Sequence, residues 1–499
     1  MSIVKNFGLG SWPQRRVRMT PDRIALTNGE QDISYRTLAD RTARLSNAFR
    51  EMGVQRGDRV AYLGPNHPTY FDVLFGATAL GAIMVPVNTR LAAPELAYVL
   101  DDSGADVIVV APTHREVLDK AIGTDSGRRV ISTEGELDGL IASAESVWMD
   151  EEVSLDDVAI IMYTSGTTGH PKGAMLTHGN LTWNITNVLI DLDFHHDEVA
   201  LIVAPLFHIA ALSMISLPLL VKGGTLLLRP GFDPGEALTL IERHGVTQMF
   251  GVPTMFNLMA KTDEWSVADV SSLRAIMCGG APVPRATIET YLDRGVIFLQ
   301  GYGMTETAPG LLFLDGASST TKAGSAGVPS FFTDARLVDH RMEDVAPGER
   351  GEVLAAGPNV MKGYWGRPEA TRGVFTGDWF HSGDVAVVDE DGYYTIVDRV
   401  KDIIISGGEN IYPAEVEDAL LYHPAVAEAA VIGVPDEKWG EVGRAVVVLR
   451  DDTSEKELLS FLEGRIARYK LPTSILFVDE LPKSGAGKIL KRRLREDLA

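Results

Sequence analysis

The sequence is poor in cysteine, since Cys278 is the only one among 499 residues. One thiol cannot form an intrachain disulfide, nor can it supply the several sulfur ligands of a cysteine-based zinc site. We therefore expect a protein of a reducing compartment and predict a cytoplasmic location.

Basic residues are also in short supply. Lys and Arg total 46 against 68 Asp and Glu, which gives a formal charge of −22. This surplus repels a polyphosphate backbone, so we predict no nucleic-acid partner. No apolar segment follows the basic residues near the N-terminus, so we expect no secretory signal.

Residues 199–221 form a stretch of 23 residues without a formal charge, which is long enough to cross a bilayer. Pro205, His208 and Pro218 lie within it and would interrupt backbone hydrogen bonding in lipid. We interpret the stretch as a buried strand, a loop and a helix, and predict no integral membrane span.

Short apolar runs alternate with helical patterns along the chain, which is typical of an α/β fold with parallel sheets. We predict strands at residues 59–63 and 106–110, and helices at 35–52 and 70–80. At about 150 residues per domain, the length suggests about three domains, or one large and one small domain. The sequence contains no repeat of fixed period.

A domain boundary is predicted between residues 398 and 399. Turn signals alternate with apolar residues over 383–394, as in a hairpin. After the boundary we predict helices at 414–422 and 455–469 and strands at 426–434 and 445–449. Residues 399–499 should therefore form a compact domain of about a hundred residues.

The strongest local signal is the segment YTSGTTGHPKG at residues 163–173, which follows an apolar strand pattern at 158–162. Its glycines let backbone N–H groups approach an anion closely, and its hydroxyls and Lys172 add donors for phosphate oxygens. It is not a Walker A loop, because Pro171 and Gly173 stand where that motif needs Gly and Ser or Thr.

Four later segments accompany this loop. They are QGYGMTE at 300–306, HSGD at 381–384, DRVKD at 398–402 running into GGENIYP at 407–413, and PKSGAGKI at 482–489. Together with the loop they resemble, in order and spacing, the acyl-adenylate-forming superfamily. The resemblance implies a large N-terminal domain (1–398) of β-sheets packed with helices, which binds ATP and the acid, and a small mobile α+β domain (399–499).

The resemblance also implies a reaction in two steps. A carboxylate attacks the α-phosphate of ATP to give an acyl-AMP and pyrophosphate, and the thiol of coenzyme A then displaces AMP. Thr164 and Glu306 are the implied ligands of Mg²⁺, an ion that prefers oxygen donors. Thr305 is implied to reach the α-phosphate, and Asp384 to accept hydrogen bonds from the ribose hydroxyls.

The resemblance assigns a larger set of residues to the nucleotide or to coenzyme A. They are Thr164, Ser165, Gly166, Thr167, Thr168, Gly169, Lys172, Gly280, Ala281, Pro282, Gln300, Gly301, Tyr302, Asp384, Arg399, Lys401, Gly407 and Gly408.

Lys488 is the implied catalytic lysine of the first step, carried by the mobile domain. A hinge near Lys401 would exchange the Lys488 loop for the Gly407-Gly408 loop before the second step. Some relatives carry a lysine for thioester formation where Ile405 stands here, and no base for the thiol is evident.

The pocket for the acid is implied to lie along residues 207–212, 252–254, 278–281 and 301–303, with His208 as a gate beside the carboxylate. The substrate-binding residues are Phe207, His208, Ala210, Ala211, Val252, Gly279 and Gly303. Only apolar residues follow His208 directly, so an amino acid would bury an unpaired ammonium group. The second histidine usual in luciferases is replaced by Ile209, which leaves an acyl-CoA synthetase.

Residues 8–13, 64–68 and 175–184 resemble bacterial feruloyl-CoA synthetases, which predicts ferulate or a related hydroxycinnamate as the acid. Fatty acyl-CoA synthetases share the core motifs and are the alternative. A non-catalytic nucleotide-binding scaffold is an alternative of another class, which the intact Lys488, Asp384 and Glu306 disfavour. The residues leave the oligomeric state open, a homodimer included.

Overall fold

The computed structural model describes residues 5–123, 126–164, 171–280, 283–399, 402, 404–406, 409–436, 439–463, 465–466, 468–483 and 488–498. The chain divides into two compact units, Met1–Ala335 with Ala355–Phe380, and Arg336–Leu354 with His381–Ala499. The predicted boundary between residues 398 and 399 stays a prediction.

The first unit contains a seven-stranded sheet in the order β18-β8-β7-β4-β3-β5-β6. Strands β7, β4, β3, β5 and β6 are parallel, while β8 pairs with β7 in an antiparallel hairpin. The parallel α/β prediction is confirmed. The bounds are β3 (Arg59–Leu63), β4 (Ile83–Pro86), β5 (Val107–Val110), β6 (Arg129–Ser132), β7 (Val158–Thr164), β8 (Lys172–Thr177) and β18 (Gly363–Tyr364).

A nine-stranded sheet in the order β15-β14-β13-β12-β11-β9-β10-β1-β2 completes the sheets of this unit. It is parallel from β13 to β1 and antiparallel at both edges. The bounds are β1 (Ile24–Thr27), β2 (Asp32–Ser34), β9 (Val199–Ile202), β10 (Thr225–Leu228), β11 (Gln248–Gly251), β12 (Ala275–Gly279), β13 (Ile297–Gly303), β14 (Gly310–Leu314) and β15 (Val328–Pro329).

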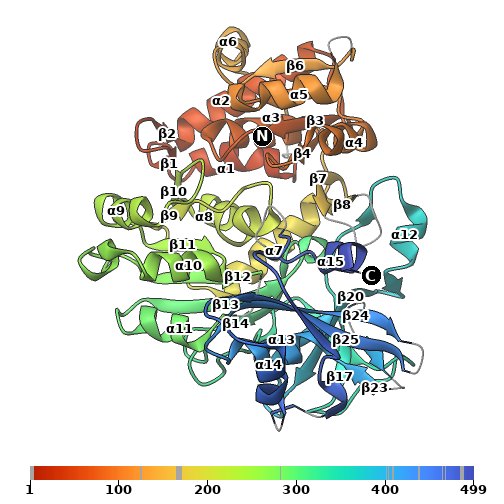
Figure 1. Cartoon of the computed structure of the whole chain (residues 1–499). Coiled ribbons are helices and arrows are strands. Elements are labelled where there is room, and N and C mark those ends of the chain that lie inside the picture. Colours follow the sequence, from red (N-terminus) through yellow and green to blue (C-terminus); the bar gives the residue numbers. More distant parts are fainter. Residues whose placement is uncertain are drawn as a thin grey trace. The chain divides into compact units, whose positions relative to one another are not determined.

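Helices cover these sheets (Figure 1). Those after β10, β11 and β12 share one core with the nine-stranded sheet, in which Phe256, Tyr291 and Phe298 pack edge to face. The bounds are α1 (Trp12–Val17), α2 (Tyr35–Glu51), α3 (Pro68–Ala79), α4 (Ala93–Ser103), α5 (Arg115–Ile122), α6 (Glu136–Ser143), α7 (His178–Asp191), α8 (Leu217–Lys222), α9 (Pro234–His244), α10 (Pro253–Ala260), α11 (Arg285–Leu292) and α12 (Pro368–Arg372).

Most residues of the uncharged stretch predicted from the sequence are buried within this unit, although His208 is exposed. The stretch forms β9, a loop, a π-helix (Ala211–Ser216) and α8, as interpreted. Among the residues that the structure describes, no helix is both long enough and apolar enough to cross a membrane.

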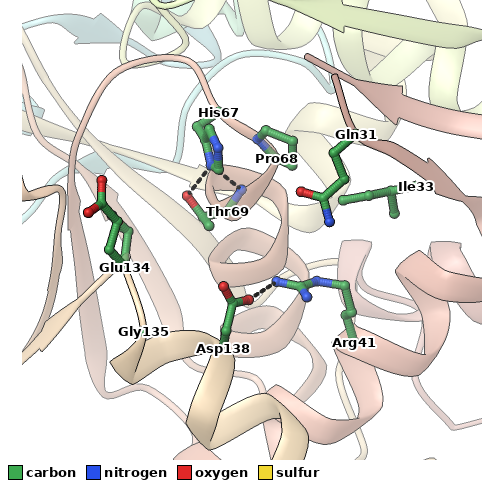
Figure 2. A pocket seen from close by; sticks show the side chains of 10 residues that line it. Gln31, Ile33, Arg41, His67, Pro68, Thr69, Glu134, Gly135 and Asp138 are labelled. Atoms are coloured by element: carbon green, nitrogen blue, oxygen red, sulfur yellow. Dashed lines mark hydrogen bonds and ion pairs between the residues drawn. The ribbon is translucent and has the colours of Figure 1, made fainter. Parts of the chain in front are cut away.

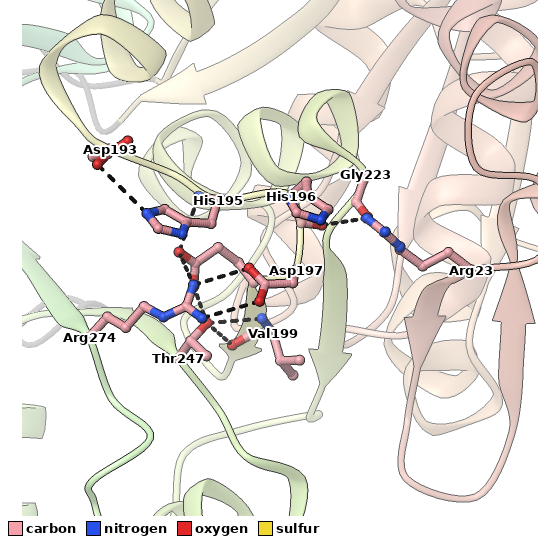
Figure 3. A network of polar contacts seen from close by, with 10 residues as sticks. Arg23, Asp193, His195, His196, Asp197, Val199, Gly223, Thr247 and Arg274 are labelled. Carbon is pink, nitrogen blue, oxygen red and sulfur yellow. Dashed lines mark hydrogen bonds and ion pairs between the residues drawn. The ribbon is translucent and has the colours of Figure 1, made fainter.

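Charged groups gather where this stretch begins (Figure 3). The carboxylate of Glu198 is fully buried, pairs with Arg274 at 3.0 Å and accepts a hydrogen bond from the hydroxyl of Thr247. The same hydroxyl accepts a hydrogen bond from the backbone N–H of Val199 at 2.9 Å. The buried charge is thus compensated at the start of β9.

In the second unit, β20 and β21 form an antiparallel hairpin, which confirms the prediction over residues 383–394. The C-terminal residues form the sheet β23-β22-β25-β24, with β26 beside β25. The strands are β16 (Asp334–Val338), β17 (Arg350–Ala356), β20 (Trp379–Val388), β21 (Tyr394–Arg399), β22 (Ile404–Ser406), β23 (Glu409–Ile411), β24 (Val426–Asp436), β25 (Gly440–Leu449) and β26 (Ser474–Phe477), and the helices are α13 (Pro413–Leu421), α14 (Glu455–Leu462) and α15 (Lys491–Leu498).

One predicted element of this unit was too long. The helix expected over residues 455–469 ends at Leu462, because the backbone leaves the helical region at Glu463, with φ −58° and ψ 128°. Gly464 follows in the sequence, and glycine costs about 1 kcal/mol in a helix interior. The helical spacing of apolar residues therefore continues in the sequence beyond the residue at which the helix ends.

Helix α7 begins with a buried histidine. The ring Nδ1 of His178 accepts a hydrogen bond from the backbone N–H of Leu9 at 3.1 Å, while Nε2 has no partner among the described residues. Burial lowers the pKa of His178 from 6.5 to about 4, because the charged imidazolium would lose its hydration.

This histidine should make the protein acid-sensitive. Between pH 6.5 and 4 the unfolded chain binds a proton at His178 that the folded chain does not, so stability falls as the pH falls. From pH 7 to pH 5 we expect a loss of about 2 kcal/mol from this group, measured by chemical denaturation.

The control is His178→Asn, whose Oδ1 can replace Nδ1 as the acceptor for Leu9. Its stability should fall less steeply over this window, because the other titrating groups are unchanged. An equal slope in both proteins would contradict the assignment.

Candidate active site

The loop predicted to bind phosphates connects β7 to β8. Thr164 and Lys172 lie opposite each other in the antiparallel pair, and the Thr164 hydroxyl donates a hydrogen bond to the Lys172 carbonyl at 3.5 Å. The loop residues Ser165, Gly166, Thr167, Thr168 and Gly169 lie outside the described residues. The pairing therefore brings the two predicted residues that flank the loop side by side.

A polar network holds both ends of this loop. Tyr163, at the end of β7, donates a hydrogen bond to Asp102 at 2.8 Å, and Tyr98 donates one to the carbonyl of Pro171 at 3.2 Å. Arg367 pairs with Asp102 at 2.5 Å. Burial and the neighbouring carboxylate of Asp102 raise the pKa of Tyr163, so its hydroxyl stays a donor.

Glu306 and Lys172 both contact the side chain of one tyrosine, Tyr364. The hydroxyl of Tyr364 donates a hydrogen bond to Glu306 Oε1 at 2.8 Å, and the ammonium of Lys172 lies 5.2 Å from the centre of the same ring. Thr305 and Glu306 lie in a short 3₁₀ helix (Thr305–Thr307) that packs against β8. Two predicted residues, Glu306 and Lys172, thus contact Tyr364, which sequence reasoning missed because β18 is only two residues long.

One of the nucleotide-binding residues predicted in β13 has a side-chain donor without a hydrogen-bond partner among the described residues. Gln300 is buried, and its Nε2 has no hydrogen-bond partner among the described residues. A buried amide N–H without a hydrogen-bond partner costs free energy unless a ligand or water accepts its hydrogen bond. This position therefore fits the base of a nucleotide, which can accept one. Tyr302 and Gly301 follow it half-buried, Gly280 has φ +85°, and Ala281 and Pro282 lie outside the described residues.

His208 lies in a segment held from behind by two buried side chains. Asn66 donates to the carbonyl of Ala204 at 2.9 Å, and Tyr70 donates to that of Leu206 at 3.0 Å. The rings of Phe207 and His208 contact each other at a tilt of 55°, with their centres 4.7 Å apart. His208 is exposed. Nevertheless, desolvation of its ring by the surrounding protein lowers its pKa to about 4, and the positive charge of Arg90 adds to the shift. The imidazole is therefore neutral at pH 7.

The wall after His208 is a π-helix, an irregularity that often marks functional sites. Ala210 precedes it, Ala211 begins it, and Met214 on it faces β13, since a methyl group added at Gly301 would lie 4.0 Å from the Met214 Cε. Sequence reasoning missed Met214, for which it has no motif. Val252 lies just before α10, as the residue that caps it.

Three other residues of the predicted pocket are explained by packing. A Cβ at Gly303 would lie 1.5 Å from the carbonyl oxygen of Pro309, and one at Gly279 would lie 3.1 Å from that of Gly301. Cys278 belongs to the core shared with α9, α10 and α11, and burial raises the pKa of its thiol. These glycines permit close backbone approach, and Cys278 faces the core.

In the second unit, Asp384 and Arg399 lie opposite each other on the β20–β21 hairpin. The backbone before Asp384 is held by Glu352, which accepts from the N–H of Gly383 at 3.2 Å and contacts His381 at 3.0 Å. The register therefore pairs Asp384, predicted to bind the ribose, with Arg399, predicted to donate to the ribose or a phosphate.

Lys488 is exposed and lies three residues before α15. That helix is fixed by Lys491, which pairs with Glu417 at 2.8 Å, and by Arg495, which pairs with Asp402 at 2.8 Å. Lys401, Gly407 and Gly408 lie outside the described residues. The tail that carries Lys488 is thus anchored in its own unit.

Comparisons with known proteins identify the family of the chain. Residues 13–365 match the family model of the AMP-binding enzyme, and residues 415–488 match that of the AMP-binding enzyme C-terminal domain. The chain belongs to the AMP-binding enzyme family.

Two curated members of the AMP-binding enzyme family align with almost the whole chain. A feruloyl-CoA synthase of an Amycolatopsis species is 56% identical over 494 residues, which cover 99% of each chain. A long-chain-fatty-acid–CoA ligase of Mycobacterium tuberculosis is 38% identical over 502 residues, which cover 99% of this chain and 98% of the other.

Solved structures of AMP-binding enzymes share the fold. The o-succinylbenzoate coenzyme A synthetase of Bacillus subtilis, in complex with ATP and magnesium ion, is 34% identical with a TM-score of 0.88, and the match covers 97% of this chain and 99% of the other. A fatty acyl CoA synthetase of Mycobacterium tuberculosis is 36% identical with a TM-score of 0.83 over 98% of each chain.

A cavity of about 280 Å³ is lined by none of the predicted site residues (Figure 2). Its polar groups mostly contact one another: Arg41 pairs with Asp138 at 2.9 Å, and His67 Nδ1 lies 3.1 Å from the Thr69 hydroxyl. Arg41 also pairs with the buried Asp72 at 2.7 Å. We assign this cavity no part in the site.

Two glycines of β13 should respond differently to a single methyl group. At Gly301 the added Cβ meets only ordinary contacts at 3.9 and 4.0 Å, so Gly301→Ala should fold but narrow the space beside Met214. We expect KM for the acid to rise about 10-fold, within the 1–3 kcal/mol range of overpacking.

At Gly303 the same methyl group would collide with the Pro309 carbonyl, so Gly303→Ala should lower the thermal unfolding midpoint instead. Thermal unfolding and steady-state kinetics of the two variants separate the effects. Equal loss of stability in both variants would argue against a free space at Gly301.

Proposed function

We propose that this protein is an AMP-forming acid–coenzyme A ligase that acts on ferulate or a related hydroxycinnamate. The observation that carries the proposal is the 56% identity with a feruloyl-CoA synthase across 99% of both chains. The alignment extends over 494 residues, so the relationship includes both the nucleotide segments and the acid segments.

In this proposal the acid carboxylate attacks the α-phosphate of ATP, and pyrophosphate leaves. The thiol of coenzyme A then attacks the acyl carbon, its proton is lost, and AMP leaves. Both steps develop negative charge, so fixed cations and donors supply most of the stabilisation. Lys172 and the hydroxyls of the loop bind phosphates, Thr305 binds the α-phosphate, and Lys488 offsets charge in the first step.

The donor set of the first unit fits Mg²⁺. The hydroxyl of Thr164 and the carboxylate of Glu306 supply oxygen atoms, the ligand type that this ion prefers. When bound, the ion would offset charge on the phosphates as pyrophosphate leaves.

The nature of the acid follows from the wall after His208. Ile209, Ala210, Ala211 and Leu212 offer no group for a substrate ammonium, and a neutral imidazole can donate one hydrogen bond to a carboxylate. An apolar acid with a single carboxylate fits these surroundings.

A fatty acid is the second candidate for the acid. The 38% identity with a long-chain-fatty-acid–CoA ligase and the absence of charge along residues 209–221 favour it. The two candidates share the nucleotide chemistry and differ in the shape of the apolar group.

Coenzyme A-dependent AMP release measures the choice directly. With ferulate, p-coumarate, caffeate, octanoate and palmitate as substrates, we expect kcat/KM to be at least about 100-fold higher for ferulate or p-coumarate than for either fatty acid, a difference of about 3 kcal/mol. Highest activity with palmitate would replace the hydroxycinnamate by a fatty acid.

A non-catalytic scaffold gives a different result in the same samples. It would bind ATP but would show no acid-dependent exchange of pyrophosphate into ATP with any member of the panel.

Lys488→Ala tests the division of labour between the steps. We expect acyl-AMP formation to fall about 100-fold or more, the size of losing one charge-stabilising group. Thioester formation from supplied acyl-AMP should change far less. Pyrophosphate exchange and single-turnover thioester formation measure the two steps separately.

The matched control is Lys483→Ala, five residues earlier, where the lysine pairs with Glu428 at 2.7 Å on the surface. It should leave both steps near the wild-type rates. Equal losses in both steps for Lys488→Ala would count against its assigned role.

A further inference from the structure

Tyr364 contacts two of the groups that the proposed reaction needs. Its hydroxyl donates to Glu306 at 2.8 Å, and its ring lies beneath the ammonium of Lys172 at 5.2 Å. These residues come from three separate segments of the sequence, so the tyrosine is the point where the metal side and the phosphate side of the site meet.

The backbone around Tyr364 is fixed on both sides. Its N–H donates to the Thr371 hydroxyl at 2.9 Å, and the N–H of Trp365 donates to the carbonyl of Gly173 at 2.8 Å. The N–H of Met361 donates to the carbonyl of Glu306 itself at 2.8 Å. The segment 361–365 is therefore tied both to the strand after the phosphate loop and to the backbone of Glu306.

The hydrogen bond has a defined direction. Tyr364 is buried, and a phenol is protonated at neutral pH even with its ordinary pKa of about 10. The phenol therefore stays protonated at neutral pH and donates, while the carboxylate accepts. One carboxylate oxygen is engaged, and the rotation of the whole group is restricted.

We propose that Tyr364 is a positioning residue that orients the Glu306 carboxylate for a divalent cation and holds Lys172 beside it for the phosphates. The inference rests on the proposed function, because it assigns Glu306 to a metal and Lys172 to ATP. Hydrogen bonds to a metal-ligating carboxylate fix its orientation, and their loss typically weakens metal binding 10–100-fold.

The ring and the hydroxyl have separate parts. The hydroxyl acts on Glu306, whereas the face of the ring attracts the Lys172 ammonium through a cation–π interaction. Tyr364→Phe removes the first and keeps the second, and Tyr364→Leu removes both.

The test measures binding of Mn²⁺ to the protein in the presence of ATP, by electron paramagnetic resonance, alongside the Mg²⁺ dependence of pyrophosphate exchange. For Tyr364→Phe we expect apparent cation affinity to fall about 10-fold or more, with kcat at saturating Mg²⁺ changed much less. Tyr364→Leu should in addition raise KM for ATP.

A double variant separates positioning from general damage to the fold. If Tyr364 acts through Glu306, then Tyr364→Phe should change Mn²⁺ affinity by less than about twofold in a Glu306→Gln background, because coupled residues are not additive. Additive losses would overturn the proposal.

Tyr62→Phe is the matched control, since Tyr62 is buried in the same unit and its hydroxyl donates to the carbonyl of Pro65 at 3.1 Å. It should leave Mn²⁺ affinity unchanged, and an equal shift in this control would also overturn the proposal. Unaltered Mn²⁺ affinity in Tyr364→Phe overturns the positioning role alone. Absence of acid-dependent exchange in the wild type overturns the proposed function, while Mn²⁺ binding still decides the role of Tyr364.

Discussion

The antiparallel pairing of β7 with β8 is the constraint on which the candidate site depends. It places Thr164 opposite Lys172, so the residues entering and leaving the phosphate loop are fixed within one hydrogen-bonded ladder. Tyr163 of β7 donates a hydrogen bond to Asp102, and Lys172 of β8 contacts the ring of Tyr364. A rigid frame of this kind holds donors in place before charge develops, which is where preorganisation is most effective.

The protein as a whole is negatively charged, whereas the residues assigned to phosphates are positively charged or neutral hydrogen-bond donors. The chain as a whole carries −22, yet the residues assigned to phosphates are cations and hydroxyls concentrated in a few segments. Several of the carboxylates in the first unit are engaged by arginines, as Asp102 is by Arg367 and Asp72 is by Arg41. Local pairing thus leaves an anionic substrate a favourable place on an acidic protein.

Periodicity and turn chemistry predicted the elements that are regular over their whole length. Strand β3 has the predicted bounds, and the hairpin of β20 and β21 follows from its turn residues, because such patterns depend on near neighbours alone. The helix at 455–469 was overextended, since apolar spacing cannot report where the backbone leaves the helix. Residue roles at the site remain predictions that came from motif resemblance.

The class of fold, the order of the motifs and the membership of the AMP-binding enzyme family follow from the amino-acid sequence, because these are properties of local pattern and motif spacing. Which residues contact one another depends on the folded chain. No sequence motif marks Tyr364, Asp102 or Met214. Sheet pairing and helix packing between distant segments bring them to the site. The same packing explains Gly303 by the carbonyl oxygen of Pro309 rather than by a ligand, since the sequence does not show how closely these two residues approach.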